Sequence, residues 1–371
     1  MLLIKNCTVV PELVEGFEGD KCDILVDGKR IAGIYECGAC DAEAEVIDAA
    51  GKYVLPGFFD LHVHLNLSGG DTLADNIKSQ NQQCFEAQLY AQRSLKAGFT
   101  FLRDVGGYFD TIHALRDAIN NEWTVGPTIH SSGKLIIPTE AGNEFFMAMY
   151  EECDTVDEIK KAVRKITAGG ADFVKVLGTG AVMNPGSEPG MPLFTDEEMQ
   201  TICDMAALKD TYVSVHCHGT RAIKQCIKAG VRTIEHASFL DDEAIEMLKG
   251  NENSFIIPTV TILIGMLEGM PESSTFMIEK AKNVINHVKE GVSKAYQEGL
   301  LIGFGTDMGG CPAVHGYNAR EFVIRRDLMG MKEIDLLKQA TINSAKIIMV
   351  EDDYGTLKAG KYADIVIVDG N

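Results

Sequence analysis

The chain has 371 residues, 46% of them hydrophobic and 24% charged, as is usual for a soluble globular protein and unlike a disordered or fibrous one. Its formal net charge of −20 at pH 7 opposes binding to a nucleic-acid backbone or to an anionic membrane surface. No stretch reaches the ~18–20 consecutive apolar residues of a membrane span, and the first residues are not typical of a secretory leader, so we expect a cytoplasmic protein without nucleic-acid or membrane partners.

The two ends of the chain carry short strand patterns. Alternating polar and apolar residues, separated by glycine-rich and acidic turns, predict strands over residues 2–10, 22–36, 44–55 and 362–369. A lone strand at the C-terminus would leave its backbone groups unpaired. We therefore expect the two ends to meet in one small β-sandwich domain, formed by residues 1–56 and 344–371.

Cys37 and Cys40 fall in a predicted turn of this domain, at a spacing that also occurs in redox and zinc motifs. No second pair of cysteines and no nearby histidine completes such a motif. We therefore assign these two cysteines a structural or adventitious role, and interpret the other eight of the ten as reduced thiols in a reducing compartment.

Between the two ends, strand patterns alternate with helical ones, which is typical of parallel βαβ units. The predicted strands span residues 54–64, 99–104, 128–132, 172–178, 212–218, 231–236, 254–261 and 300–306. The clearest helical patterns cover residues 76–97, 155–168, 195–209 and 276–298. Eight repeats of this unit favour a closed (β/α)₈ barrel over an open sheet, so we predict an α/β fold with a barrel over residues 57–343.

His62 and His64 stand at the end of the first barrel strand. Because side chains alternate along a strand, both imidazoles are expected to face the mouth of the barrel, where they could share a metal ion. Alone, this spacing is common by chance.

Lys175 interrupts an apolar strand, where a bare ammonium would carry a large desolvation penalty. Two interpretations stay open from the residues alone. The neutral amine could add CO₂ and become an anionic carbamate between two metal ions, or the side chain could extend from the strand end into water.

His216 ends the fifth predicted strand, His236 ends the sixth, and Asp307 follows the eighth. Barrel enzymes place their sites at the carboxyl ends of their strands, so these side chains should converge with the earlier ones. Nitrogen and carboxylate ligands suit zinc, with iron, manganese or nickel as substitutes.

Taken together, these motifs resemble those of the amidohydrolase superfamily over essentially the whole chain. The matching stretches are residues 54–64, 97–104, 173–180, 234–236, 305–307 and 360–364. The resemblance implies a site for two divalent ions, with zinc expected and CO₂ held as a carbamate on Lys175. It implies six ligands, namely His62, His64, Lys175, His216, His236 and Asp307. Asp307 would also be the catalytic residue that accepts and returns a proton.

Within the superfamily, residues 185–187, 216–219 and 315–318 resemble the prolidase-like and imidazolonepropionase-like branch, which includes dipeptidases and carboxypeptidases acting on Xaa-Pro. The chain departs from that branch at residues 135–143, where many relatives have a Gly-Gly-His-Gly stretch. With Glu140 and Glu144 close by, a basic or polar C-terminal residue in the substrate is at least as compatible with this loop as proline.

The resemblance also suggests side chains that touch the substrate: His218, His315, Tyr317, Asn318 and Arg221. For Arg103 and Asp104, a structural ion pair beneath the site is favoured over a carboxylate anchor. His113 and His287 fall on helices, where packed or surface histidines are the rule, and the role of His130 is left open.

The expected reaction is hydrolysis of an amide bond in a small molecule such as a dipeptide or an N-acyl amino acid. The alternative is a cyclic-amide or lactone hydrolase or a deaminase of the same superfamily. Lys175, and Gly219-Thr-Arg221 in place of a glutamate, disfavour a one-metal deaminase. Retention of all six ligands disfavours a non-catalytic barrel. The sequence leaves a homo-oligomer open.

Overall fold

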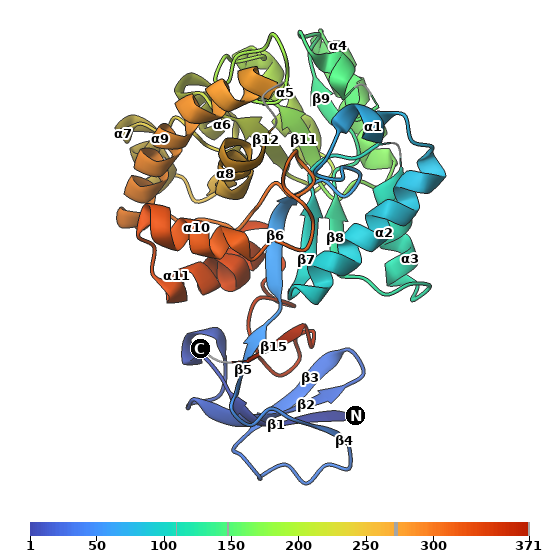
Figure 1. Ribbon diagram of the computed structural model, residues 1–371, viewed down its shortest axis with the longest axis vertical. Coiled ribbons are helices and arrows are strands. Elements are labelled where there is room, and N and C mark those ends of the chain that lie inside the picture. Colours follow the sequence, from blue (N-terminus) through green and yellow to red (C-terminus); the bar gives the residue numbers. More distant parts are fainter. Residues whose placement is uncertain (109, 147, 271–273, 370–371) are drawn as a thin grey trace.

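The computed structural model describes residues 1–108, 110–146, 148–270 and 274–369. It has two parts (Figure 1): a large α/β part, and a small β-domain below it that holds both ends of the chain. Along the described chain, no helix is both long and apolar enough to cross a membrane.

The small β-domain is built from strands at both ends of the sequence. Its strands are β1 (Leu2–Thr8), β2 (Lys21–Asp27), β3 (Arg30–Tyr35), β4 (Glu45–Asp48), β5 (Lys52–Pro56) and β15 (Ile365–Asp369). They pair in the order β15-β5-β1-β2-β3, with β4 also on β1. The C-terminal β15 runs antiparallel to β5, with Val366 opposite Leu55. The domain has its own hydrophobic cluster, which includes Ile4, Cys22, Ile24 and Val54.

The large part is the predicted barrel. Its strands are β6 (Phe58–Val63), β7 (Phe99–Asp104), β8 (Thr128–Ser131), β9 (Leu135–Ile137), β11 (Val174–Leu177), β12 (Val213–Cys217), β13 (Thr233–His236) and β14 (Phe255–Ile257), with β10 (Tyr150–Glu152) beside β9. Neighbouring strands are parallel. Residues 301–308 close the ring, because Ile302 bridges to Ile256 of β14 and Met308 bridges to Val63 of β6.

Three barrel positions differ from the predicted strands. The third barrel strand is divided into two. The first half, β8, pairs with β7; the chain then turns at Gly133 (φ 65°), and the second half, β9, pairs with β11. Residues 135–137 are therefore a strand rather than a loop. The seventh ends at Ile257, because Pro258 has no N–H with which to continue the ladder. The eighth is irregular and glycine-rich. A Cβ at Gly305 would lie 2.9 Å from that of His62.

Helices follow most barrel strands and cover the outside of the ring (Figure 1). They are α1 (Thr72–Asn76), α2 (Gln80–Lys96), α3 (Thr111–Asn120), α4 (Val156–Ala168), α5 (Asp196–Ala207), α6 (Thr220–Ala229), α7 (Asp242–Lys249), α8 (Val260–Gly269), α9 (Thr275–Gln297), α10 (Arg320–Met329), α11 (Glu333–Lys338) and α12 (Ser344–Ile347). The predicted helix over 76–97 is divided, because Ser79 caps a new helix at its N-terminus. The predicted capping box of Thr195 and Glu198 is present at the start of α5.

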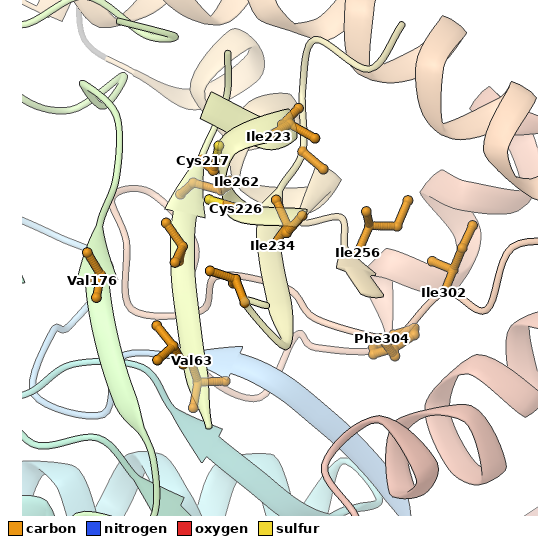
Figure 2. Packing of buried hydrophobic residues seen from close by; sticks show 14 of the residues in the cluster. Val63, Val176, Cys217, Ile223, Cys226, Ile234, Ile256, Ile262, Ile302 and Phe304 are labelled. Carbon is orange, nitrogen blue, oxygen red and sulfur yellow. The ribbon is translucent and has the colours of Figure 1, made fainter. Parts of the chain in front are cut away.

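The main core lies between the ring of strands and the helices. Figure 2 shows part of this core, with Val176 of β11, Ile234 of β13 and Ile256 of β14 in the same cluster as Ile223 of α6 and Ile262 of α8. Val174 and Val176 of β11 are in this core, so alternation turns Lys175 to the inside of the barrel. The apolar layer thus fixes which side chains face the site.

Candidate metal centre

A pocket opens at the carboxyl ends of the barrel strands, and all six predicted ligands line it. They come from β6, β11, β12, β13 and the segment after Phe304, which are far apart in sequence but converge in the ring. The space free of protein atoms is about 820 Å³, part of it continuous with solvent.

The ligand atoms lie close enough together to hold metal ions. Asp307 Oδ1 is 3.5 Å from His62 Nε2 and 3.6 Å from His64 Nε2. Two groups have potential ligand atoms within 4.8 Å of one another: His62, His236 and Asp307, and His216, His218 and His236. His236 belongs to both groups, which places the two potential positions side by side.

Hydrogen bonds fix the orientation of the histidine rings. Nδ1 of His62 lies 2.7 Å from Glu235 Oε2, and Nδ1 of His64 lies 2.9 Å from the carbonyl oxygen of Gly106. Nδ1 of His236 lies 2.6 Å from Thr259 Oγ1. Because the second nitrogen of each ring is held in this way, Nε2 is left for the pocket, which is the usual arrangement of histidine ligands.

Four residues that line the pocket have a buried polar atom without a hydrogen-bond partner among the described residues: Lys175 Nζ, Asn184 Nδ2, His216 Nε2 and His236 Nε2. A buried polar atom left unpaired costs about 1–3 kcal/mol. For the two imidazole nitrogens, a divalent cation is a partner that would satisfy them. The donor set therefore fits a metal centre.

The charge states agree with this interpretation. Burial lowers the pKa of His64 to about 4 and that of His218 to about 3, and it lowers the pKa values of His62, His216 and His236 well below the ordinary value. At neutral pH these five rings are neutral, so each keeps a nitrogen lone pair that a metal ion can bind.

Lys175 and Asp307 are also perturbed. Burial lowers the pKa of Lys175 to about 8, so part of the amine is uncharged and nucleophilic near neutral pH. Burial raises the pKa of Asp307 to about 7, although the positive charge of Lys175 opposes this shift. Both groups lie close to the pH at which proton transfer is most useful to an enzyme.

The backbone is strained at this end of the pocket. His236, Ala237 and Asp307 have φ values of 67°, 46° and 62°, which side chains with a Cβ rarely adopt. Such conformations persist where the surrounding fold imposes them, and they are concentrated at functional sites.

Glu235 was not predicted from the sequence, but it is central to the base of the site. Its Oε1 accepts hydrogen bonds from Arg103 Nη2 at 2.6 Å and Ser214 Oγ at 2.8 Å, while its Oε2 faces His62. Burial opposes ionisation of Glu235, but Arg103 and Lys175 hold its pKa below the ordinary value. The missed signal was a carboxylate in a buried strand directly before a candidate ligand.

Arg103 forms a buried ion pair, as predicted, but the prediction that Asp104 is its partner is wrong. Arg103 pairs with Glu235, and Asp104 instead accepts hydrogen bonds from the backbone amides of Leu65 and Gly106. The two side chains follow each other on a strand, so they point in different directions.

Of the five predicted substrate contacts, only His218 lines the pocket. His315 turns its Nε2 to the carbonyl oxygens of His64 and Leu67, and Asn318 donates to Asp60 at 2.7 Å. Both are therefore packed beneath the site.

Tyr317 and Arg221 are exposed and lie outside the pocket lining. His130 packs edge-on against Phe101 of the neighbouring strand, and His113 and His287 lie on helices away from the site. Cys37 and Cys40 are free thiols, the first exposed and the second partly buried.

The wall of the pocket above the metal ligands is mostly apolar, with Tyr150 and Asn184 as its polar members. It includes Leu135, Phe146, Met149, Val182, Leu263 and Met266. Glu140 and Glu144, expected near the substrate, do not line it. The expectation of a basic or polar group beside this loop is therefore not supported.

The sequence profile described as "Amidohydrolase family" matches residues 53–371. Ochratoxinase from Aspergillus niger is 28% identical over 352 residues, which cover 86% of this chain and 70% of that protein. Imidazolonepropionase from Caldanaerobacter subterraneus subsp. tengcongensis is 23% identical over 373 residues, covering 93% of this chain and 83% of the relative. Among solved structures, a Xaa-Pro dipeptidase with methionine bound in its active site is 30% identical, with a TM-score of 0.90 over 100% of this chain and 94% of that chain.

Proposed function

The chain belongs to the amidohydrolase family, and we propose that it is a two-metal enzyme that hydrolyses the amide bond of a dipeptide or an N-acyl amino acid. Family membership, together with amide-hydrolysing relatives, makes it a hydrolase of carbon–nitrogen bonds. The observation that carries the two-metal proposal is the pair of overlapping ligand groups that share His236, with unpartnered nitrogens facing the same pocket.

We assign the metal ligands to His62, His64, His216, His236 and Asp307, with zinc as the expected metal. The sixth ligand is Lys175 after reaction with CO₂. Its neutral Nζ forms a bond to the carbon of CO₂ and loses one proton to solvent, which leaves a carbamate with one negative charge. The lowered pKa and full burial of Lys175 favour the neutral amine that this step needs.

Two divalent ions supply a water-derived nucleophile at neutral pH and polarise the scissile carbonyl. The protein's own part in the reaction falls mainly to Asp307. Its carboxylate lies at the same end of the pocket as the histidines, where it can accept a proton from the attacking water and deliver it to the leaving nitrogen. Release of a neutral amine then completes the cleavage.

His218 is assigned to the substrate rather than to the metal. Its Nδ1 lies 2.7 Å from Ser238 Oγ, which leaves Nε2 free to donate to the carbonyl oxygen as negative charge develops there. The inclusion of His218 in one of the ligand groups makes a direct metal contact the competing assignment.

A second candidate function is hydrolysis of a cyclic amide or a lactone. The similarity to imidazolonepropionase favours it, because that relative is matched over most of its length. An acyclic peptide or amide bond is the preferred substrate bond, because the Xaa-Pro dipeptidase structure has a higher sequence identity than imidazolonepropionase and covers the whole of this chain.

Other properties remain proposals from the sequence. We propose that residues 57–343 form the catalytic domain and that residues 1–56 and 344–371 form its companion. We also propose that the protein acts in the cytoplasm on a small molecule, without nucleic-acid or membrane partners, and leave a homo-oligomer open.

A hydrolysis screen tests the proposed reaction. Zinc-loaded protein is incubated with dipeptides and N-acyl amino acids in one set and with lactones and cyclic ureides in another, and released amines are measured alongside ring opening. We expect turnover in the first set. Negligible turnover there, together with efficient ring opening, would replace the proposal with the second candidate.

A further inference from the structure

The pocket has two chemically different ends. Beyond the six predicted ligands and His218, no charged side chain of the described residues lines it. The upper wall is formed by β9, the segment leading to β10, the β11–α5 segment, α8 and α9. A charged group placed there would lose its water without gaining an ionic partner, which is costly.

A second hollow adjoins this wall and shares Phe146 and Met183 with the catalytic pocket. Its other lining residues are mostly apolar or small, with one carboxylate at its rim: Gly70, Asp71, Thr72, Phe145, Met270, Ser274, Met277 and Cys311. Met183 also packs against both the main barrel cluster and the cluster around Phe146. These two side chains therefore lie between the two hollows.

We infer that the substrate carries an extended apolar group, which runs from the metal end of the pocket past Phe146 and Met183 towards Met270 and Met277. This inference rests on the proposed function, because the scissile amide must lie beside the metal ligands. Methionine side chains are flexible and polarisable, so a slot lined by them suits a chain or a ring of variable shape. The apolar group could belong to the acyl side or to the amine side of the amide.

Binding of the reaction products tests the inference without any turnover. Zinc-loaded protein is titrated by calorimetry with acetate, butanoate and octanoate as the acyl series, and with glycine, 2-aminohexanoate and 2-aminodecanoate as the amine series. A buried methylene raises affinity about fourfold. We expect at least about a 100-fold gain across one series, which also identifies the side of the amide that the slot receives. Flat affinities in both series would overturn the inference.

Substitutions locate the slot. Met183→Glu should reduce the affinity ratio of the longest to the shortest ligand by at least about tenfold, because its carboxylate would stand in the path of the apolar group. Met277→Glu, at the far end of the second hollow, should reduce the same ratio if Met183→Glu fails to fold. Met191→Glu is the matched control, because Met191 lies in the same β11–α5 segment but is 63% exposed and lines neither hollow.

The outcomes separate the two proposals. An unchanged ratio in both glutamate variants would overturn the slot. Failure to hydrolyse N-octanoylglycine despite tight binding of octanoate, or N-acetyl-2-aminodecanoate despite tight binding of 2-aminodecanoate, would instead count against the proposed amide hydrolysis.

Discussion

The two ends of the pocket are built by different means. At the base, ring nitrogens, carboxylates and the lysine come from strand ends, and hydrogen bonds orient the rings, as Glu235 on the other side of the barrel does for His62. The wall comes from β9, helices α8 and α9 and connecting segments, and most of its side chains are apolar. The base is thus fixed in geometry, whereas the wall can be re-shaped without disturbing the reacting groups. Chemistry and substrate choice should respond separately to substitution.

The largest effect on catalysis, with the least effect on substrate choice, is expected for Asp307→Asn. This change removes the group that moves the proton but keeps the size of the side chain. We expect kcat to fall by roughly 10²–10⁴-fold, the range that general acid–base groups contribute. Steady-state kinetics and elemental analysis of the same sample measure this. A loss of bound metal in proportion to the loss of rate would make Asp307 a ligand only.

Lys175→Ala removes the proposed carbamate. We expect a loss of activity larger than the roughly 10–100-fold that outer partners of a metal site typically contribute. Added acetate or propionate should restore part of the rate, because a small carboxylate can occupy the space of the carbamate. Full activity without such an addition would refute the carbamate.

Glu235→Gln tests the hydrogen bonds that orient the metal ligands at the base of the pocket. It removes the charge that faces both Arg103 and the ring of His62, so His62 should lose part of its basicity and orientation. We expect metal affinity to weaken by roughly 10–100-fold. Competition with a chromophoric chelator measures this directly. Unaltered affinity would reduce Glu235 to a packing residue.

The smallest effect on rate is expected at the wall. Met266→Ala removes apolar contact from the pocket, so KM should rise by roughly tenfold for a substrate with an apolar group, while kcat should change by less than about threefold. Tyr317→Ala is the control, because Tyr317 is exposed outside the pocket. A Met266 effect confined to kcat would show that base and wall are not independent.

The sequence anticipated the base far better than the wall. His62 and Lys175 could be placed because alternation along a strand and the convergence of strand ends in a barrel are general rules. Glu235 escaped because it directly precedes His236, and adjacent strand residues should face opposite sides. The left-handed backbone of His236 (φ 67°) breaks that rule at the strand end. No sequence pattern predicts this left-handed backbone conformation.

The wall depends on contacts between distant segments. His315 was expected at the substrate, but it stacks on Tyr90 of α2 and contacts backbone carbonyls, which local sequence does not reveal. Phe146 and Met183 belong to separate connections and meet only in the folded chain. The fold class could be predicted because eight strand–helix repeats have few closed solutions, whereas side-chain contacts between connections have many.

Metal content tests the central claim most directly. Protein expressed with supplemented zinc is freed of loosely bound ions and measured by elemental analysis together with its concentration. Six ligands that include an anionic carbamate exceed the needs of one tetrahedral zinc, so we expect about two ions per chain, falling to about one or fewer in Lys175→Ala. No more than one ion per chain in the wild-type protein, even after supplementation, would contradict the two-metal centre.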